Sequence, residues 1–468
     1  MITESAFPRT PTVNTMNEIL CSKNPADDQL VGEVEITHVN AIPGMIEIAR
    51  SAQIEWRRSS IEERAALVSG AAEPLSREAE RLGTLISKEM GKPIDRAIGE
   101  AVYCAGELPR IAQAVAAALQ PQEMEGRRAR STLYFDPLGV CAAITPWNYP
   151  VSMPQSLVIP ALVAGNSVIL KPSEETPLSG GAYASLLNEV LPPGVLQVVQ
   201  GADTQGRGLV EAPIDLIAFT GSRAVGKQIM AAAAKRLTRV ILELGGKDPM
   251  IVLDDADIEK AASFAVENSF ENAGQMCVST ERIYVDEKVA DAFESRVAEI
   301  ARSVVLGSGS VGDAYVGPMV NARQRAHVLG QIDRALQAGA RMLAGKQDVP
   351  EGYVAPTVLV NVDTEMDIMR EETFGPVACI QRFTTVDEAV AQANDNPYGL
   401  GAAVFGQDEA RAFNVARRLE SGMIGINKGC FGVTGTPWVG AKQSGYGYHG
   451  SADGYRQFAQ VRVITQPK

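Results

Sequence analysis

Cysteine and histidine are scarce in this chain of 468 residues, which contains six cysteines and three histidines. The cysteines are widely scattered and none forms a Cys-x-x-Cys pair, so we expect free thiols in a reducing compartment rather than a disulfide framework. None of the histidines, His38, His327 and His449, is clustered with a cysteine, so the sequence predicts no metal site. A histidine-dependent cysteine protease is also disfavoured, because no histidine is marked as the partner of a thiol.

Runs of basic residues and long apolar segments are missing as well. The net charge is −13 and the isoelectric point is about 5.0, which argues against a nucleic-acid surface. No stretch approaches the apolar length of a membrane span. The first residues, Met1 to Ser5, have neither a basic nor an apolar signal region. We therefore expect a cytoplasmic protein without a membrane partner.

The chain is too long for a single hydrophobic core, so two or three domains are expected. Residues 1–20 are polar and aperiodic, and we expect a loose arm there. Between about 42 and 120 the apolar residues recur at steps of three and four, which predicts helices. Cys104 lies on such a stripe, so we expect it to fill the core. The stripe consists of Ala101, Cys104, Leu108, Ile111, Val115 and Ala118.

After residue 130 short apolar runs alternate with helices. The first runs predict buried strands at Val140–Ile144, Ser167–Leu170, Leu196–Val199, Leu216–Phe219 and Val240–Leu242. The helices between them include Pro177–Val190 and Arg223–Lys235. A second set of strands is predicted near Met250–Leu253, Arg282–Val285, Val377–Gln381 and Ala402–Phe405. Such alternation predicts parallel strands with crossover helices, and hence an α/β fold with two doubly wound domains.

Three side chains in a fixed order point to carbonyl chemistry. Cys277 ends the run Gly-Gln-Met-Cys, Glu243 begins Glu-Leu-Gly-Gly-Lys, and Asn148 lies in Thr-Pro-Trp-Asn-Tyr-Pro. They offer a soft nucleophile, a carboxylate base and an amide donor, the parts needed to process a carbonyl through a thioester. Each alone is weak evidence, because a buried structural cysteine and a turn asparagine are commoner. In this order and spacing, from about residue 20 to the C-terminus, the chain resembles the aldehyde dehydrogenase superfamily.

The resemblance implies a role for each of the three residues. Cys277 would attack the aldehyde, although a free cysteine, with a pKa of about 8.5, is only a few per cent thiolate at neutral pH. The side-chain amide of Asn148 and the backbone N–H of Cys277 would stabilise the resulting alkoxide. After hydride transfer, Glu243 would activate the water that opens the thioester. The product would be a free carboxylic acid.

A glycine-containing turn favours a dinucleotide site. A predicted strand runs into residues 220–226, a G-x-x-x-x-G turn in which Ser222 can cap the next helix while free N–H groups face a pyrophosphate. The turn alone is weak evidence, but in the family it binds a nicotinamide dinucleotide. Lys171 can donate to ribose hydroxyls, and the charge of Glu174 would repel a 2′-phosphate, so NAD is favoured and NADP is the alternative. By the resemblance, the cofactor residues are Thr145, Trp147, Lys171, Ser173, Glu174, Gly221, Ser222, Leu244, Gly245, Glu372 and Phe374.

The resemblance also implies domain boundaries. A dinucleotide-binding domain would comprise 20–121 and 138–243, a catalytic domain 244–444, and an oligomerisation arm 122–137 and 453–468. A hairpin in 122–137 and a final strand Val461–Thr465 would join a partner subunit's sheet, since a bare strand edge is a liability. We therefore expect a homodimer or homotetramer.

Several positions depart from the family's pattern. The lysine expected nine residues after Asn148 is Leu157, and the arginine that succinate-semialdehyde members carry just before it is Ser156. The C-terminal Ser-Gly-x-Gly-Arg-Glu is replaced by Ser-Gly-Tyr-Gly-Tyr-His, which ends at His449. The lysine and the glutamate are thought to form a proton path, so both ends of it are missing here. His449 would either replace the path or simply pack.

These departures bear on the substrate. The usual Pro-Phe-Gly-Gly is Pro-Trp-Val-Gly around Trp438, and the matched pocket contains no cation, so a neutral or apolar aldehyde fits better than an ω-carboxylate. Two alternatives stay open: a succinate-semialdehyde dehydrogenase, and a non-catalytic structural or binding member of the family. The intact catalytic residues count against the second. The expected pocket residues are Tyr149, Met153, Leu157, Met276, Phe431 and Trp438.

Overall fold

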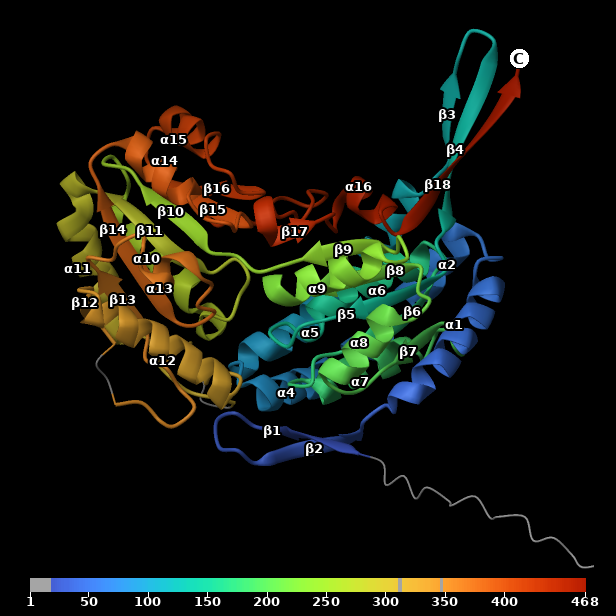
Figure 1. Ribbon diagram of the computed structural model, residues 1–468, viewed down its shortest axis with the longest axis horizontal. Coiled ribbons are helices and arrows are strands. Elements are labelled where there is room, and N and C mark those ends of the chain that lie inside the picture. The colour runs from blue at the N-terminus through green and yellow to red at the C-terminus, as the bar shows by residue number, and fades with distance from the viewer. Residues whose placement is uncertain (1–17, 310–313, 346–347) are drawn as a thin grey trace, which may run out of the picture.

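A computed structural model describes residues 18–309, 314–345 and 348–468. The loose arm expected for residues 1–20 falls almost entirely within 1–17, outside the described residues. Figure 1 shows two helix-covered sheets and a slender arm that carries the C-terminus. Both sheets are built from alternating strands and helices, which confirms the predicted α/β fold.

The first sheet has six strands in the order β17-β9-β8-β5-β6-β7. Five of them run parallel and contain or overlap the five predicted strands. The sixth strand, β17 (Gly445–Tyr446), is antiparallel and pairs Gly445 with Glu243. The chain therefore returns from the second sheet to the end of β9. The parallel strands are β5 (Val140–Ile144), β6 (Ser167–Lys171), β7 (Leu196–Val198), β8 (Leu216–Thr220) and β9 (Arg239–Glu243).

Helices cover both faces of this sheet, because successive side chains of a strand point in opposite directions. In β5, Cys141 and Ala143 pack into one core, whereas Val140, Ala142 and Ile144 pack into another. This is the doubly wound arrangement that the sequence predicted. The first core is built with α2 (Ile61–Ser69), α3 (Ala72–Arg77), α4 (Ala79–Met90), α5 (Ile94–Ala118), α6 (Ser152–Val163) and α7 (Pro177–Leu187). The second is built with α1 (Ile42–Trp56), α8 (Asp203–Glu211) and α9 (Arg223–Ala234).

The long helix α5 carries the predicted apolar stripe. Its stripe residues are buried except Ile111, which is half-buried. Cys104 is 1% exposed and belongs to the first core, so the prediction of a core cysteine is confirmed. The start of the same helix reaches the functional site described below.

The second sheet has seven strands in the order β12-β13-β14-β11-β10-β15-β16. Its centre contains the four predicted strands as β10 (Asp248–Val252), β11 (Thr280–Asp286), β14 (Val377–Phe383) and β15 (Gly401–Phe405). The edge strands β12 (Arg341–Ala344), β13 (Thr357–Val360) and β16 (Met423–Ile426) were not predicted. The helices of this part are α10 (Ile258–Phe270), α11 (Glu287–Ser303), α12 (Ala322–Gln337), α13 (Asp367–Arg370), α14 (Val386–Asn394) and α15 (Glu409–Ala416).

Two small antiparallel sheets complete the fold. One pairs β1 (Ile19–Lys23) with β2 (Leu30–Glu35). The other forms the arm from β3 (Gln122–Glu125), β4 (Ala129–Pro137) and β18 (Ala459–Pro467), and follows α16 (Ser451–Arg456). The predicted hairpin and final strand are therefore present, and Figure 1 shows them projecting away from the body. Among the described residues, no helix has both the length and the apolar character needed to cross a membrane.

Candidate active site

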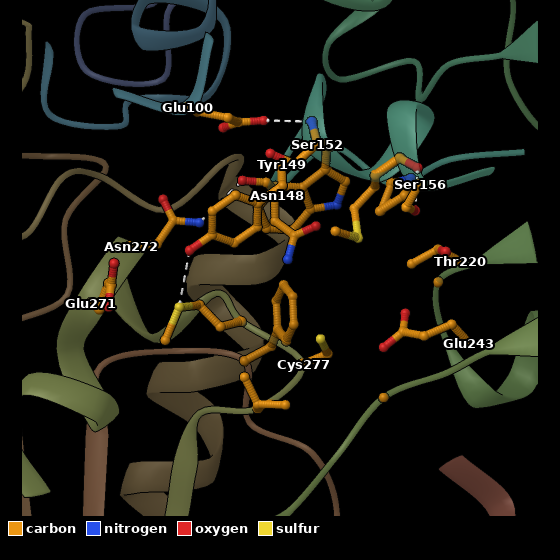
Figure 2. A pocket seen from close by; sticks show the side chains of 18 of the residues that line it. Glu100, Asn148, Tyr149, Ser152, Ser156, Thr220, Glu243, Glu271, Asn272 and Cys277 are labelled. Atoms are coloured by element: carbon orange, nitrogen blue, oxygen red, sulfur yellow. Dashed lines mark hydrogen bonds between the residues drawn. The ribbon is translucent and has the colours of Figure 1, made fainter. Parts of the chain in front are cut away.

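A cavity of about 980 Å³ gathers most of the predicted site residues. The three predicted catalytic residues, Cys277, Glu243 and Asn148, all line it. Figure 2 shows the Glu243 side chain turned toward the side of the cavity that carries Cys277. The other predicted residues that line the cavity are Trp147, Tyr149, Met153, Gly221, Ser222, Leu244, Gly245, Met276, Glu372, Phe374, Phe431 and Trp438.

A strained turn places Cys277. The 3₁₀ turn η2 (Glu271–Gly274) has left-handed φ angles of 52°, 58° and 69° at Asn272, Ala273 and Gly274. A Cβ on Gly274 would lie 2.1 Å from the carbonyl oxygen of Gly375, so only glycine fits there. Left-handed non-glycine residues cost energy and cluster at functional sites. The turn thus presses the segment before Cys277 against the loop that contains Gly375.

The Cys277 side chain is half-buried and opens onto the cavity. Burial raises the pKa of its thiol well above the usual range, and the nearby Glu243 carboxylate raises it further. The thiol of the free protein therefore keeps its proton at neutral pH. The backbone N–H of Cys277 donates to no backbone acceptor among the described residues, which leaves it available to an oxyanion.

Two glycines bring Glu243 beside this thiol. A Cβ on Gly246 would lie 2.2 Å from the Cys277 carbonyl oxygen, and one on Gly245 would lie 2.3 Å from the Glu372 carboxylate. Burial raises the pKa of Glu243 to about 7, whereas the Trp438 indole, which donates at 3.1 Å, and the Cys277 thiol lower it. A carboxylate whose pKa is near neutrality is well matched to general-base work.

Asn148 lies in the loop between β5 and α6, at the carboxyl end of β5. Its side-chain Nδ2 donates to the carbonyl oxygen of Gln275 at 3.0 Å, which leaves one amide hydrogen for a ligand. Its own carbonyl oxygen accepts from Lys92 Nζ at 2.9 Å and from Asn272 Nδ2 at 3.3 Å. The amide is thus oriented by the same turn that places the thiol.

A buried ion pair holds the Asn148 loop from behind. The side chains of Lys92 and Glu100 are 2% and 3% exposed, and Lys92 Nζ lies 2.5 Å from Glu100 Oε2. The other oxygen of Glu100 accepts from the backbone N–H groups of Val151 and Ser152 at 3.0 and 3.1 Å, and Figure 2 shows the second of these bonds. A buried pair is tolerated when its remaining hydrogen-bonding capacity is satisfied in this way.

Polar groups without protein partners lie where the strand order of the first sheet reverses. The chain passes from β5 to β6 and β7 and then back to β8, so the switch point lies between β5 and β8. Thr145 directly follows β5 and Thr220 is the last residue of β8, and the hydroxyl oxygens of both are buried without a partner among the described residues. Ser222 is the N-cap of α9, which begins at Arg223, and its Oγ accepts from Val225 N at 3.4 Å. Ligands of open α/β sheets bind at such switch points.

Four predicted cofactor residues do not line the 980 Å³ cavity. Thr145, Lys171, Ser173 and Glu174 lie at or just beyond the adjacent ends of β5 and β6, where Thr145 N donates to the Lys171 carbonyl oxygen at 3.1 Å. Lys171 Nζ lies 3.7 Å from Glu174 Oε2, and the two side chains are 6% and 40% exposed. They therefore lie at the edge of the sheet that also carries the cavity residue Thr220, and Glu174 is the most exposed of the four.

The Glu372 loop closes the cavity from the second sheet. Glu281 of β11 accepts at 2.8 Å from the backbone N–H of Phe374, whose ring meets Trp147 edge-on with centroids 5.5 Å apart. Glu372 Oε1 accepts from Gly246 N at 3.0 Å, and burial raises the pKa of Glu372 to about 8. An aromatic pair and a carboxyl group thus stand next to the thiol segment.

The chain is similar to known proteins over nearly its whole length. Residues 13–464 match the model of the aldehyde dehydrogenase family. The chain belongs to this family. It is 35% identical over 446 residues to a glutarate-semialdehyde dehydrogenase of Pseudomonas putida, and 35% identical over 448 residues to a succinate-semialdehyde dehydrogenase of Escherichia coli that is named for NADP(+). Each match covers 94% of this chain and 93% of the relative. The crystal structure of an NAD-dependent aldehyde dehydrogenase from Sinorhizobium meliloti has a TM-score of 0.93 and 34% identity, over 96% of this chain and 92% of that one.

Membership confirms the prediction of an aldehyde dehydrogenase that uses a nicotinamide dinucleotide, NAD or NADP. The residues present fit such a group. The N-terminus of α9 offers backbone N–H groups, and Thr145 and Thr220 contribute unpartnered buried hydroxyls at the switch point. The Glu372 loop would hold the end of the cofactor nearest the thiol.

The prediction for Leu157 in this aldehyde dehydrogenase was wrong. Leu157 is 0% exposed and belongs to the core that α6 shares with α2 and α5. Met153 and Ser156, on the same helix, line the cavity instead. Consecutive residues point about 100° apart around a helix axis, so Ser156 reaches the cavity while Leu157 reaches the core.

The expectation of a pocket without cations was also wrong. Lys92 and Arg96 both line the cavity, just before and at the start of α5. Each is already paired: Lys92 with Glu100, and Arg96 with Glu271 at 2.5 Å between Nη1 and Oε1. The side chains of Arg96 and Glu271 are 34% and 31% exposed. Because α5 packs against the turn η2, these charged side chains reach the cavity wall. No local pattern in the sequence indicates this contact.

His449 packs against Trp438. Its ring is 7% exposed and stacks on Trp438 at an interplanar angle of 13°, with centroids 6.4 Å apart. Burial lowers the pKa of His449 to about 4, so the ring is neutral at neutral pH. Among the described residues it makes no hydrogen bond to Glu243; Trp438 reaches that carboxylate instead.

Other residues of the cavity wall were missed. Gln324 Nε2 donates to the carbonyl oxygen of Phe374 at 3.1 Å, and His327 Nε2 lies 3.2 Å from that of Glu372, so α12 braces this loop. These positions look like ordinary polar helix residues in the sequence, and nothing nearby marks them. The unpredicted wall residues include Tyr103, Ile111, Ser152, Gln155, Arg323, Gln324 and His327.

Proposed function

We propose that this enzyme oxidises a neutral or apolar aldehyde to a carboxylic acid with NAD, through a thioester on Cys277. The convergence of Cys277, Glu243 and Asn148 on one cavity supports this most strongly. The Cys277 thiol would pass its proton to water as its sulfur adds to the aldehyde carbon, and the resulting alkoxide would face Asn148 Nδ2 and the Cys277 N–H. When bound, the dinucleotide supplies the hydride acceptor. Water that has given a proton to Glu243 would then open the thioester.

Cys277→Ala tests the covalent route. The variant should lose dehydrogenase activity while still binding NAD, because the thiol takes part in chemistry and the dinucleotide is held elsewhere. Steady-state NADH formation above about a hundredth of the parent rate would contradict the thioester. An unaltered protein that binds NAD but oxidises no aldehyde would instead favour the non-catalytic alternative.

The wall beyond the thiol supports a neutral substrate. Two of the three cations that line the described cavity, Lys92 and Arg96, are paired with Glu100 and Glu271, and the third, Arg323, belongs to α12, the helix that braces the Glu372 loop. Beside Lys92 and Arg96, an ω-carboxylate would therefore enter as a charge without a free partner, which costs several kcal/mol. Apolar and aromatic side chains dominate the rest of this wall: Tyr149, Met153, Met276, Phe431 and Trp438.

Succinate semialdehyde is the second candidate. Two relatives at 35% identity are named for glutarate and succinate semialdehydes, and Arg96 lies on the wall at a position that the sequence did not predict. To bind a substrate carboxylate, Arg96 would have to leave Glu271. Whether Arg96 pairs with Glu271 or with the substrate carboxylate therefore distinguishes the two candidate substrates.

Substrate profiles distinguish them. We expect the parent to show a higher kcat/KM for hexanal or benzaldehyde than for succinate semialdehyde. Ser156→Arg adds a free cation and Glu271→Gln releases Arg96, so each should raise kcat/KM for succinate semialdehyde by about tenfold. Ser156→Gln, which adds length without charge, is the matched control and should not. A parent that prefers succinate semialdehyde would overturn the neutral-substrate proposal in favour of the second candidate.

Glu174 supports NAD over NADP. Its carboxylate is 40% exposed at the edge of the sheet and lies 3.7 Å from Lys171 Nζ, so the nearest ammonium is already engaged. A 2′-phosphate placed there would meet a like charge. Glu175 is a suitable control position, because Asn321 Nδ2 holds its carboxylate at 2.7 Å. Glu175→Gln should change the preference far less than Glu174→Ser.

We also propose that the protein is a homodimer or homotetramer in the cytoplasm. In each subunit, residues 20–121 and 138–243 would bind the dinucleotide and residues 244–444 would supply the thiol. Residues 122–137 and 453–468 would join the subunits. The arm exposes apolar side chains along β18, including Val463 at 58% and Ile464 at 47%, beside an open strand edge. All six cysteines are free, which suits a reducing compartment. Sedimentation of the full chain should give a dimer or tetramer, and Val463→Lys should weaken it; a monomeric parent would contradict the proposal.

A further inference from the structure

The Glu243 carboxylate is held by an indole. Trp438 Nε1 donates to Glu243 Oε1 at 3.1 Å, and Glu243 itself is 5% exposed. A donor directed at a buried carboxylate stabilises its charged form.

The surroundings of Trp438 fix the indole in place. Its backbone N donates to the His449 carbonyl oxygen at 2.9 Å, and its ring stacks on the His449 imidazole. Phe431 contacts it with centroids 5.5 Å apart at 51°. His449 is fixed in turn by α16, because a Cβ on Gly454 would lie only 2.9 Å from the His449 carbonyl carbon. The indole N–H therefore has little freedom to turn away from the carboxylate.

We propose that Trp438 is a positioning residue for Glu243 in thioester hydrolysis, with His449 as the neutral platform that supports the indole. The inference rests on the proposed function. With Oε1 of Glu243 engaged by the indole, Oε2 is the oxygen available to a water molecule in the cavity. Trp438 and His449 belong to one local arrangement, since the two rings stack.

The step balances without another reactant. The water oxygen bonds to the thioester carbon, one water proton passes to Glu243, and the carbon–sulfur bond breaks with Cys277 leaving as a thiolate. Hydride transfer from the thiohemiacetal moves no proton through Glu243. The effect of Trp438 should therefore be confined to the release of the acid.

Trp438→Phe removes the donor and keeps an aromatic ring. We expect NADH formation in the first turnover to stay within about twofold of the parent rate. Release of the carboxylic acid, measured by rapid quenching, should be about tenfold slower at neutral pH. Trp56→Phe is the matched control, since it removes an indole N–H that is committed to the Leu162 carbonyl oxygen away from this site, and it should change neither phase. Equal slowing of both phases in Trp438→Phe, or of neither, would overturn the proposal.

The pH profile gives a second readout that mere packing would not move. Losing the N–H donor raises the pKa of Glu243. In Trp438→Phe, the pH below which release of the carboxylic acid product slows should therefore rise by about one unit. The titratable groups that share this site are Cys277, Asp248 and Glu372, and none of them is altered by the substitution. An unmoved limb would contradict the role of the hydrogen bond.

A double variant tests whether Trp438 acts through Glu243. In a Glu243→Gln background no general base remains to be positioned, so Trp438→Phe should slow acid release by less than about twofold further. An additive tenfold loss would mean that the indole works on the substrate or the thiol, and would overturn the assignment.

A measurement without any tryptophan variant guards against misfolding. The chain has three tryptophans, and Trp56 Nε1 is already committed to the Leu162 carbonyl oxygen at 2.9 Å. In ¹⁵N-tryptophan spectra one indole N–H resonance should titrate near pH 7 in the parent and stay unmoved in Glu243→Gln. No titrating indole would refute the inference, even if aldehyde oxidation is observed. Failure of the proposed function would appear differently, as no NADH with any aldehyde in the unaltered protein.

Discussion

Replacing Glu243 with glutamine separates the two halves of the proposed reaction. Glutamine keeps the size of the side chain and an oxygen that can accept from Trp438, but it cannot take a proton. It also removes the charge that raises the pKa of the Cys277 thiol, so thiolate formation becomes easier. First-turnover NADH formation should therefore stay within about threefold of the parent, whereas acid release should fall about 10²–10⁴-fold.

The structure also sets the pH dependence of this effect. Burial raises the pKa of Glu243 to about 7, so about half of the carboxylate is ionised at pH 7, about a tenth at pH 6 and about nine tenths at pH 8. Acid release by the parent should fall about fivefold between pH 7 and pH 6 and rise less than about twofold between pH 7 and pH 8. The glutamine variant should lack this limb.

Stopped-flow absorbance of NADH with hexanal follows the first half, and rapid quenching with quantification of hexanoate follows the second. The expected record for Glu243→Gln is one NADH per active site followed by very slow turnover. A first turnover that slows as much as the steady state would show that Glu243 also takes the proton of the thiol. Unchanged acid release would remove Glu243 from the chemistry altogether.

Three further predictions follow from buried and edge charges. Glu174→Ser should narrow the ratio of kcat/KM for NAD over NADP, and a parent that uses NADP as well as NAD would contradict the role of Glu174. Burial raises the folded-state pKa of Glu243 from 4.5 to about 7. Between these two pH values the folded state binds more protons than the unfolded state. This carboxylate therefore destabilises the fold increasingly as pH rises from 4.5 to about 7. The Tm of Glu243→Gln should thus gain on the parent from pH 5 to pH 8, and a constant difference would count against the raised pKa. Lys92→Met leaves Glu100 buried without its partner and should lower the free energy of unfolding by about 3–5 kcal/mol, whereas Arg58→Met, at an exposed pair, should cost less than about 1 kcal/mol in urea titrations.

The architecture was readable from the chain because it rests on local patterns. Val140–Ile144 and the other central strands are short apolar runs, fully buried on both faces, and such runs separated by helical periodicity have few other folds available. Edge strands such as β12 and β16 are short and partly exposed, so they lack that signal. Their place in the sheet comes from pairing with neighbours that lie elsewhere in the sequence.

The chemical residues divide in the same way. Cys277, Glu243 and Asn148 lie in distinctive local runs, so the sequence alone indicates them. Which of two adjacent residues, Ser156 or Leu157, faces the cavity depends on how α6 is rotated against its neighbours, and a helix with apolar residues on all sides does not reveal that.

Contacts between distant segments lay wholly outside the reach of the sequence. Trp438 lies far from Glu243 along the chain and reaches it only because β17 returns to pair with β9. The ion pair between Arg96 and Glu271 likewise requires that α5 and the turn η2 meet. Local composition determines strands, helices and reactive side chains, because those depend on near neighbours. Which charges are neutralised and which carboxylate is held depends on packing geometry between segments, and that arises only when the chain is folded.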